Sequence, residues 1–170
     1  YNGYEGKQYE YGGNDSTQRS YDLRGDLVYS IGDSTYGNKN AGYTVTWNST
    51  DLTIPAGATI KEAWLYMAYT WDSANLFPNN MHITFDDQNV SYVKWYYDLS
   101  NFGSWGYGVY GMLTYNVTSL FQPNAKNNVT TLNGVGSAAL YPFTLMVIYE
   151  DSNSTEKQIF INDGYDLLGV

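Results

Sequence analysis

The chain has 170 residues and 43% hydrophobic content, which is enough for one domain with a real core, and its formal net charge is −9. This charge excludes nucleic acid and acidic membranes as partners, because phosphate backbones and anionic headgroups repel an acidic protein. Cysteine is absent and histidine occurs once, at His82, whereas tyrosine occurs 19 times, a balance that excludes disulfides and zinc catalysis and favours a structural or binding role over an enzyme.

The first segment, residues 1–22, is predicted to be an extended arm. It contains no Leu, Ile, Val, Met or Phe, so it cannot form a core of its own. Its large side chains are tyrosines, which can anchor an extended segment on another surface. The predicted contact residues of the arm are Tyr1, Tyr4, Tyr9, Tyr11 and Tyr21.

From Leu23 onward the pattern changes to that of a β domain, which is predicted to cover residues 23–170. Residues 23–31 alternate in a way that is typical of a half-buried strand. Residues 59–71 and 142–150 are apolar on both faces, which predicts strands that are covered on both sides. Further strands are predicted over residues 43–47, 81–85, 90–97 and 107–118.

The end of the chain is predicted to be a hairpin, with strands over residues 158–161 and 165–170 and a tight turn at 162–164. Within the strand over residues 107–118, Gly108 and Gly111 predict a bulge or close packing. No amphipathic helix of three turns is present. Short strands at regular intervals, with Gly, Pro and Asn in the turns, predict an all-β, two-layer β-sandwich that is jelly-roll-like in its long crossings.

Two features predict an extracellular chain. It begins with Tyr1 rather than Met, which predicts that a leader was removed or that the sequence was trimmed. It also contains N-x-S/T sequons, which mark acceptors of N-linked glycans but also arise where Asn, Ser and Thr populate turns and polar strand faces. A secreted domain without cysteine favours an archaeal or bacterial surface. The predicted glycosylation sites are Asn14, Asn48, Asn89, Asn116, Asn128 and Asn153.

Four sequence blocks carry a resemblance to a known family. They are Pro55-x-Gly57-Ala58-x-Ile60-x-x-Ala63-x-Leu65-Tyr66 followed by Thr70-Trp71; Tyr107-Gly108-x-Tyr110 leading to Asn116-Val117-Thr118; Met146 to Asp151; and Ile161-Asn162-Asp163-Gly164-x-Asp166-Leu167-Leu168. By order and spacing, over about residues 23–168, the chain resembles a family of secreted surface domains of unknown function that is common in methanogenic archaea. The resemblance implies a β-rich cell-surface protein and no established chemistry. Members of that family look longer, so it also implies an unpaired sheet edge where this chain stops.

An open edge and a tyrosine-rich arm together predict strand addition between copies of the chain, in which one copy's extended segment completes the sheet of another. Repeated head to tail, this contact builds a filament. The donated strand is predicted to be residues 1–21 or residues 165–170; the alternative is a loose leader and a self-paired final hairpin. The edge residues at the C-terminal end are Tyr165, Leu167, Leu168 and Val170. The predicted function is a structural subunit of an extracellular archaeal filament or surface layer.

A rival hypothesis is a carbohydrate-binding adhesion module on the cell surface, with surface polysaccharide as the partner. Sugar rings stack on exposed aromatic side chains, and such side chains cluster near residues 101–111. Asp98 and Asn101 are candidate partners for sugar hydroxyls. The alternative is that the same rings fill the core and a subunit contact. The predicted platform consists of Trp95, Tyr97, Trp105 and Tyr107.

No cofactor is predicted, although hard oxygen ligands could hold Ca²⁺. The chain has no EF-hand spacing, and acidic turn residues are more often only solvated. Any pair of carboxylates across a sandwich could be nominated for glycoside hydrolysis, so no catalytic residue is predicted. His82 is predicted to point outward from an alternating strand. The candidate Ca²⁺ ligands are Asp72, Asp86, Asp87, Asp98, Glu150 and Asp151.

Overall fold

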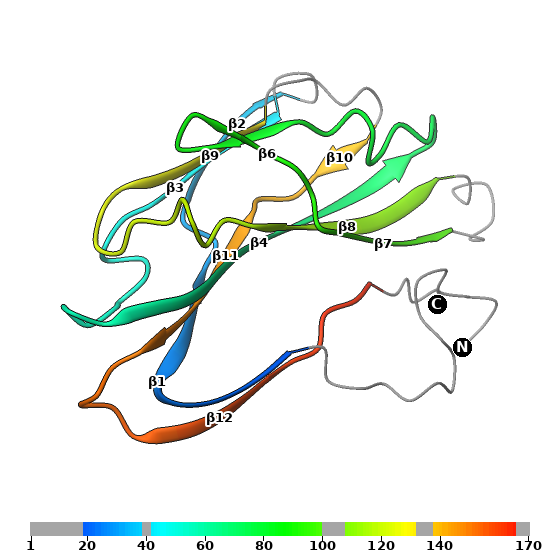
Figure 1. Cartoon of the computed structure of the whole chain (residues 1–170). Coiled ribbons are helices and arrows are strands. Elements are labelled where there is room, and N and C mark those ends of the chain that lie inside the picture. The colour runs from blue at the N-terminus through cyan, green and yellow to red at the C-terminus, as the bar shows by residue number, and fades with distance from the viewer. Residues whose placement is uncertain (1–18, 39–41, 100–107, 132–137, 166–170) are drawn as a thin grey trace, which may run out of the picture.

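The computed structural model describes residues 19–38, 42–99, 108–131 and 138–165. In this part of the chain, β-strands form two antiparallel sheets that pack face to face (Figure 1). The described residues hold no helix, and so none that could cross a membrane. The prediction of an all-β, two-layer fold is confirmed.

The larger sheet is seven-stranded and is curled like half of a barrel. In spatial order its strands are β12 (Glu156–Ile161), β1 (Arg19–Ser30), β11 (Thr144–Glu150), β4 (Thr59–Asp72), β8 (Val109–Asn116) and β7 (Lys94–Leu99), and β10 (Ala139–Leu140) also pairs with β4. The smaller, five-stranded sheet has the order β2 (Asp33–Asn38), β3 (Gly42–Trp47), β9 (Asn127–Thr131), β5 (Ile83–Phe85) and β6 (Gln88–Val90).

Strands β4 and β11 lie in the interior of the large sheet, as their apolar residues on both faces predicted. In β4 the consecutive residues Trp64 and Leu65 are both buried although they point to opposite faces. In β11 every residue from 145 to 149 is buried. Burial on both faces shows that the large sheet is covered by the small sheet on one side and by another element on the other.

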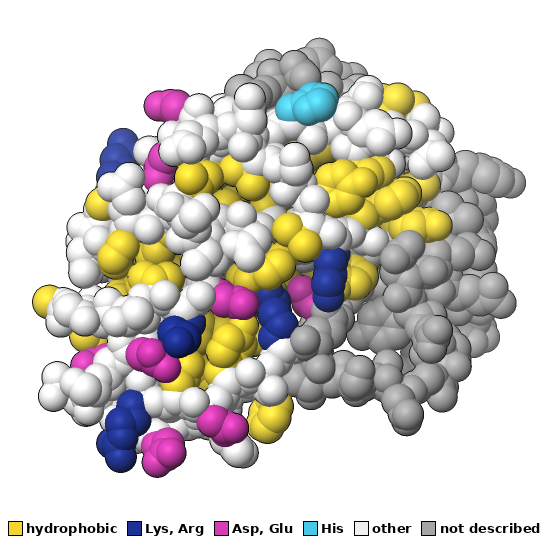
Figure 2. Space-filling model, viewed as in Figure 1, with side chains coloured by type: hydrophobic (Ala, Val, Ile, Leu, Met, Phe, Trp, Pro, Cys, Tyr) yellow, Lys and Arg dark blue, Asp and Glu magenta, His cyan; other side chains and the backbone are white. Residues whose placement is uncertain are grey.

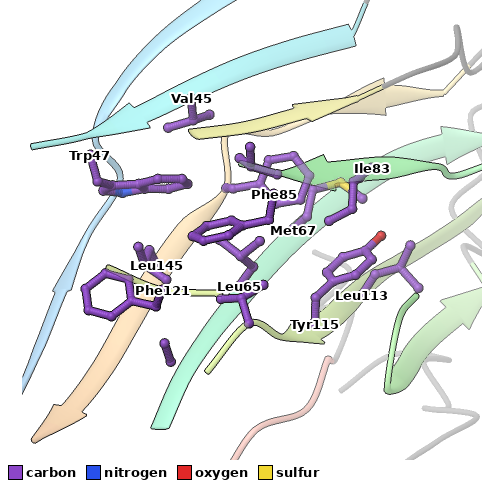
Figure 3. Packing of buried hydrophobic residues seen from close by; sticks show 14 of the residues in the cluster. Val45, Trp47, Leu65, Met67, Ile83, Phe85, Leu113, Tyr115, Phe121 and Leu145 are labelled. Carbon is purple, nitrogen blue, oxygen red and sulfur yellow. The ribbon is translucent and has the colours of Figure 1, made fainter. Parts of the chain in front are cut away.

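The main core lies between the two sheets (Figure 3). Trp47 of β3 is fully buried, and its Nε1 donates a hydrogen bond to the Ser30 carbonyl oxygen at 2.9 Å, where β1 crosses toward the small sheet. A Cβ atom at Gly32, which has a φ of +57°, would lie 2.5 Å from the Thr46 carbonyl oxygen. Glycine is therefore required at this crossing. Other labelled members of the core are Val45, Leu65, Met67, Ile83, Phe85, Leu113, Tyr115, Phe121 and Leu145.

Several strands differ from the sequence-based expectation. The predicted strand over residues 90–97 is divided between β6 and β7, which lie in different sheets. Strands β2, β9 and β10 were not predicted. Strand β9 is mostly polar, and it buries Asn127 because the Asn127 amide donates to the carbonyl oxygens of Gln122 and Ala125. A buried strand whose polar groups are satisfied in this way gives no apolar signal.

The predicted irregularity near Gly108 and Gly111 is present. The register between β4 and β8 shifts between the pairs Tyr69–Gly111 and Asp72–Val109, so β4 contains a bulge opposite Tyr110, which lies between the two glycines in sequence. A Cβ atom at Gly111 would lie 2.4 Å from the Tyr96 carbonyl oxygen. Close packing therefore explains this glycine.

One core hydroxyl gives a testable prediction. Tyr115 is 1% exposed, its hydroxyl has no hydrogen-bond partner among the described residues, and burial raises its pKa above the usual value. We expect Tyr115→Phe to raise the free energy of unfolding by about 1 kcal/mol, because it removes an unsatisfied buried polar group. The matched variant Tyr69→Phe should lower it by about 1–2 kcal/mol, since the Tyr69 hydroxyl accepts a 2.8 Å bond from Trp95 Nε1. Urea unfolding of both variants tests this, and equal effects would contradict it.

Candidate functional site

The long strand β1 changes partners at Gly25, which is the pivot of the candidate site. Residues 25–30 pair with β11, whereas residues 19–24 pair with β12. A Cβ atom at Gly25 would lie 1.9 Å from the Tyr149 carbonyl oxygen, so only glycine allows this approach. The first half of β1 and β12 together form a flap, residues 19–24 and 156–161, that bends away from the rest of the large sheet (Figure 1).

The inner side of the flap covers a second, smaller core on the outer face of the large sheet. Its buried members are Leu23 and Ile161 of the flap and Trp64, Met146 and Ile148 of the sheet. Tyr21 and Ile159 of the flap pack partly buried against it. The flap therefore buries Trp64 of β4 and Met146 and Ile148 of β11 on the second face of the large sheet.

A polar joint fastens the end of the flap to β4. Arg19 Nη1 donates to Glu62 Oε2 at 3.3 Å, and Arg19 Nη2 donates to the Tyr66 hydroxyl at 2.7 Å. The same Nη2 lies 3.5 Å from Asp163 Oδ2, just after β12. The guanidinium also lies 4.1 Å from the centre of the Trp64 ring. These contacts are charge-assisted and half-buried, so they hold the flap more firmly than exposed ion pairs would.

Asp163 extends the joint to β7. Its Oδ1 accepts a 3.2 Å hydrogen bond from the Tyr96 hydroxyl and lies 4.0 Å from Lys94 Nζ. Burial raises the pKa of Tyr66 to about 12, although the Arg19 charge acts against this. In Figure 2, basic and acidic side chains lie side by side in the middle of this face. The joint is therefore a network of charge-assisted hydrogen bonds and ion pairs, in which the buried Arg19 Nε has no hydrogen-bond partner among the described residues.

The outer edge of β12 is the exposed part of the flap. Among the described residues, β12 pairs only with β1, so no strand covers its other edge. Phe160 points away from the second core and is 59% exposed, between the partly buried Ile159 and the buried Ile161. The first half of β12 is charged, and Lys157 forms an ion pair with Asp26 of β1. Within the described chain, the edge thus combines a row of unpaired backbone groups with an exposed aromatic ring.

Neither Phe160 nor Arg19 was predicted as a site residue. The signal for Phe160 was available, because residues 159–161 are three consecutive apolar residues in a strand. Side chains alternate between the two faces of a strand, so the middle one of three consecutive apolar residues must lie on the face opposite to the other two. Arg19 gave no such signal, since its partners Glu62 and Asp163 are distant in sequence.

The predicted contact residues lie only partly within the described chain. Tyr21 belongs to β1, which begins at Arg19, ahead of the predicted domain start at Leu23. Tyr165 follows β12 and lies in no strand. The strand over residues 158–161 exists as β12, but it pairs with β1. Outside the described residues are Tyr1, Tyr4, Tyr9, Tyr11, Leu167, Leu168 and Val170.

The predicted sugar platform is described only at Trp95 and Tyr97. Their rings stack on each other, with centroids 4.3 Å apart and planes 21° apart, and both pack against the main core. Trp95 Nε1 also donates to Tyr69. These contacts favour the alternative in which the rings complete the core. Trp105, Tyr107 and Asn101 lie outside the described residues, and Asp98 is described only in its backbone.

The candidate Ca²⁺ ligands whose side chains the structure describes do not converge. Among the residues that the structure describes, no group of three His, Asp or Glu side chains could hold a metal. Asp72 accepts backbone hydrogen bonds from Leu76 and Phe77, and Asp86 Oδ1 accepts one from Asn128. His82 is exposed, as predicted.

Glu150 and Asp151, together with Asp87, complete the set of carboxylates. Glu150 pairs with Lys61 at 3.3 Å, and Asp151 accepts bonds within its own turn. Both line an open groove of about 720 Å³ beside the Gly25 pivot. Asp87 is exposed, and with Asp86 it forms the turn between β5 and β6, where both residues have positive φ angles. Each of these carboxylates has an ordinary role in a turn or an ion pair.

The sequons differ in exposure. Asn89, Asn116 and Asn153 are exposed, and Asn48 and Asn128 are partly buried. Asn14 lies outside the described residues. Exposure alone therefore separates the predicted glycosylation sites into two groups.

The fold and the flap define a two-sheet, all-β domain with one curled sheet. A family model described as a protein of unknown function (DUF3344) matches residues 3–170. The chain belongs to this family, and the match includes most of the segment predicted to be an arm. Searches of curated proteins and of solved structures find no match to the chain.

Proposed function

We propose that this protein is a structural subunit of an extracellular archaeal filament or surface layer, built by strand addition between copies. The observation that carries the proposal is the open edge of β12 with the exposed ring of Phe160. Proteins that stay monomeric commonly protect such edges with charges, prolines or short strands. Here the protection reaches only the first half of β12, at Glu156 and Lys157.

An incoming strand would gain main-chain hydrogen bonds along residues 159–161 and an apolar contact with Phe160. Burying a Phe side chain contributes about 1.5–3 kcal/mol. A donor can come from the segment before Arg19, because 18 residues span up to about 60 Å when extended. That segment contains Tyr1, Tyr4, Tyr9 and Tyr11.

The extracellular location is part of the proposal. It is supported by the sequons, by the absence of cysteine and by the acidic, tyrosine-rich composition. The resemblance to secreted domains of methanogenic archaea adds the expectation of an archaeal cell surface.

The test is electron microscopy and mass photometry of the full chain and of two lysine variants. We expect the wild type to form ordered assemblies, and Phe160→Lys to raise the concentration needed for assembly at least about tenfold, because the charge opposes burial of the edge. Val93→Lys is the matched control, since Val93 is 51% exposed but lies outside the flap. Unchanged assembly of Phe160→Lys would exclude the β12 edge as the joint. Monodisperse wild-type monomers would overturn the proposal.

A second candidate function is carbohydrate binding, and Trp71 is the observation that favours it. Trp71 lies in the bulge of β4, is 42% exposed, and has a φ of +63°, which is uncommon for a bulky residue. Its ring is 5.6 Å from that of Tyr110. If the protein proves monomeric, retention of the chain on immobilised polysaccharide, with loss of retention in Trp71→Ala, would establish this candidate.

A further inference from the structure

Three sequons of this chain share nearly the same local sequence but occupy different places in the fold. They are Asn89-Val90-Ser91, Asn116-Val117-Thr118 and Asn128-Val129-Thr130. A transferase that acts on the folded protein needs the asparagine amide, the hydroxyl two residues later and access to the backbone between them. The structure therefore distinguishes, by accessibility, sequons that have equivalent sequences.

Asn128 is partly buried, and its strand is paired along both edges. It lies on β9, which is paired with β3 on one side and β5 on the other. Its Oδ1 accepts a 2.8 Å hydrogen bond from the Thr46 hydroxyl, and its backbone N–H donates to Asp86 Oδ1 at 2.7 Å. The hydroxyl of its sequon, on Thr130, lies 3.4 Å from that of Thr44. An enzyme could reach this tripeptide only by opening the sheet.

Asn116 is exposed, but its sequon is engaged. Its Oδ1 accepts a 3.0 Å hydrogen bond from the Thr118 backbone N–H. The Thr118 hydroxyl accepts a bond from the Ala63 N–H at 3.0 Å and is 3.4 Å from the Ala63 carbonyl oxygen. Val117 between them is fully buried. The hydroxyl that an enzyme must contact is therefore held by β4.

Asn89 lies on the same sheet face as Asn128. Thr130 of the Asn128 sequon pairs with Thr84, and Thr84 pairs with Asn89, so these side chains share one face of the small sheet. The surroundings of Asn89 are nevertheless open. It lies on β6, which among the described residues pairs only with β5, and both Asn89 and Ser91 are exposed. No hydrogen bond within the described chain involves the Asn89 side chain.

The Asn153 sequon is also exposed, but it lies in a loop. Asn153 and Thr155 are both exposed between β11 and β12. The Asn153 amide donates only a 3.3 Å bond to Asp151, at a position open to solvent. Such a bond contributes little, so it does not keep the amide from an enzyme.

We propose that Asn89 and Asn153 carry N-linked glycans, whereas Asn116 and Asn128 stay unmodified because the fold withholds them. The donor is a sugar linked through phosphate to a lipid. The Asn Nδ2 forms a bond to the sugar C1, the bond from C1 to the phosphate oxygen breaks, the lipid phosphate leaves, and the amide loses one proton. The inference rests on the extracellular location in the proposed function, and it does not depend on assembly.

Glycopeptide mass spectrometry of the protein purified from the cells that produce it tests the inference. We expect a glycan mass on the peptides that contain Asn89 and Asn153, and the unmodified mass for those that contain Asn116 and Asn128. Asn89→Gln should remove one glycan mass from the intact chain, whereas Asn128→Gln should remove none. Because each asparagine is read separately in the wild type, the result does not depend on whether a variant folds.

The inference would be overturned if Asn89 carried no glycan, or if the glycan occupancy of Asn128 or Asn116 equalled that of Asn89. Imaging the same preparation keeps this result apart from the proposed function. Ordered assemblies of unmodified chains would leave strand addition standing and exclude the glycans. Glycosylated monomers would support the glycans and overturn strand addition.

Discussion

Gly25→Ala is expected to lower the free energy of unfolding by about 3 kcal/mol, one of the two largest single effects that we predict. The added methyl group would lie 1.9 Å from the Tyr149 carbonyl oxygen and 2.8 Å from Leu23 Cδ1. Backbone cannot yield as the end of a flexible side chain can, so β1 must move away from β11. The flap would then lose its fit over the second core. Urea unfolding monitored by tryptophan fluorescence measures the loss.

Gly57→Ala is the matched control for this variant. Gly57 has a φ of +84°, but a Cβ atom there would meet nothing within 4 Å. Its substitution should therefore cost only the backbone strain, about 1 kcal/mol. Equal losses for the two alanines would show that contact with Tyr149 does not explain the glycine at the pivot.

Asp72→Ala should cost about 3 kcal/mol, through a different mechanism. Asp72 is 1% exposed, and its two carboxylate oxygens accept backbone hydrogen bonds from Leu76 at 3.0 Å and Phe77 at 2.8 Å. Hydrogen bonds to a charged group contribute about 1.5–3 kcal/mol, and alanine would leave the buried Phe77 N–H without a partner. The turn after β4 would lose the group that organises it.

The same unfolding measurement tests Asp72, with Asp33→Ala as its control. Asp33 is exposed at the start of β2, so its loss should change the free energy of unfolding by less than about 0.5 kcal/mol. If added Ca²⁺ stabilises the wild type but not Asp72→Ala, or if a chelator lowers the stability of the wild type but not of that variant, the carboxylate binds metal and the hydrogen-bond account is wrong.

The sequence predicted those parts of the fold in which burial follows a simple period. Strands β4 and β11 are apolar on both faces, and both lie in the interior of the large sheet. Strand β9 escaped prediction because its inward residues include Asn127 and Thr131, whose burial depends on partners elsewhere in the chain. The flap was not predicted because its inner side begins with Arg19 and Tyr21, which in sequence resemble the polar residues of the arm. Their burial depends on Glu62 and Trp64, which are distant in sequence.

The candidate site differs in place from the predicted contact residues. The resemblance implied an open sheet edge at the end of the chain, whereas the edge that the described residues show is that of β12. Its pairing with β1 joins residues more than 130 positions apart, such as Asp22 and Gln158. No local pattern specifies a register over that separation, because it is set by Gly25 and by the packing of Leu23 and Ile161.

The pairing of Arg19 with Ile161 also determines how the domain bears a load. The two strands of the flap are antiparallel, and β1 begins where β12 ends, so a pull between Arg19 and Asp163 would open their hydrogen bonds one after another, starting at the joint. A pull along the outer edge of β12 would instead load all the bonds of an added strand at once. A polymer joined at that edge would therefore resist tension better than the flap of a single subunit does, and its weakest point would lie inside the subunit.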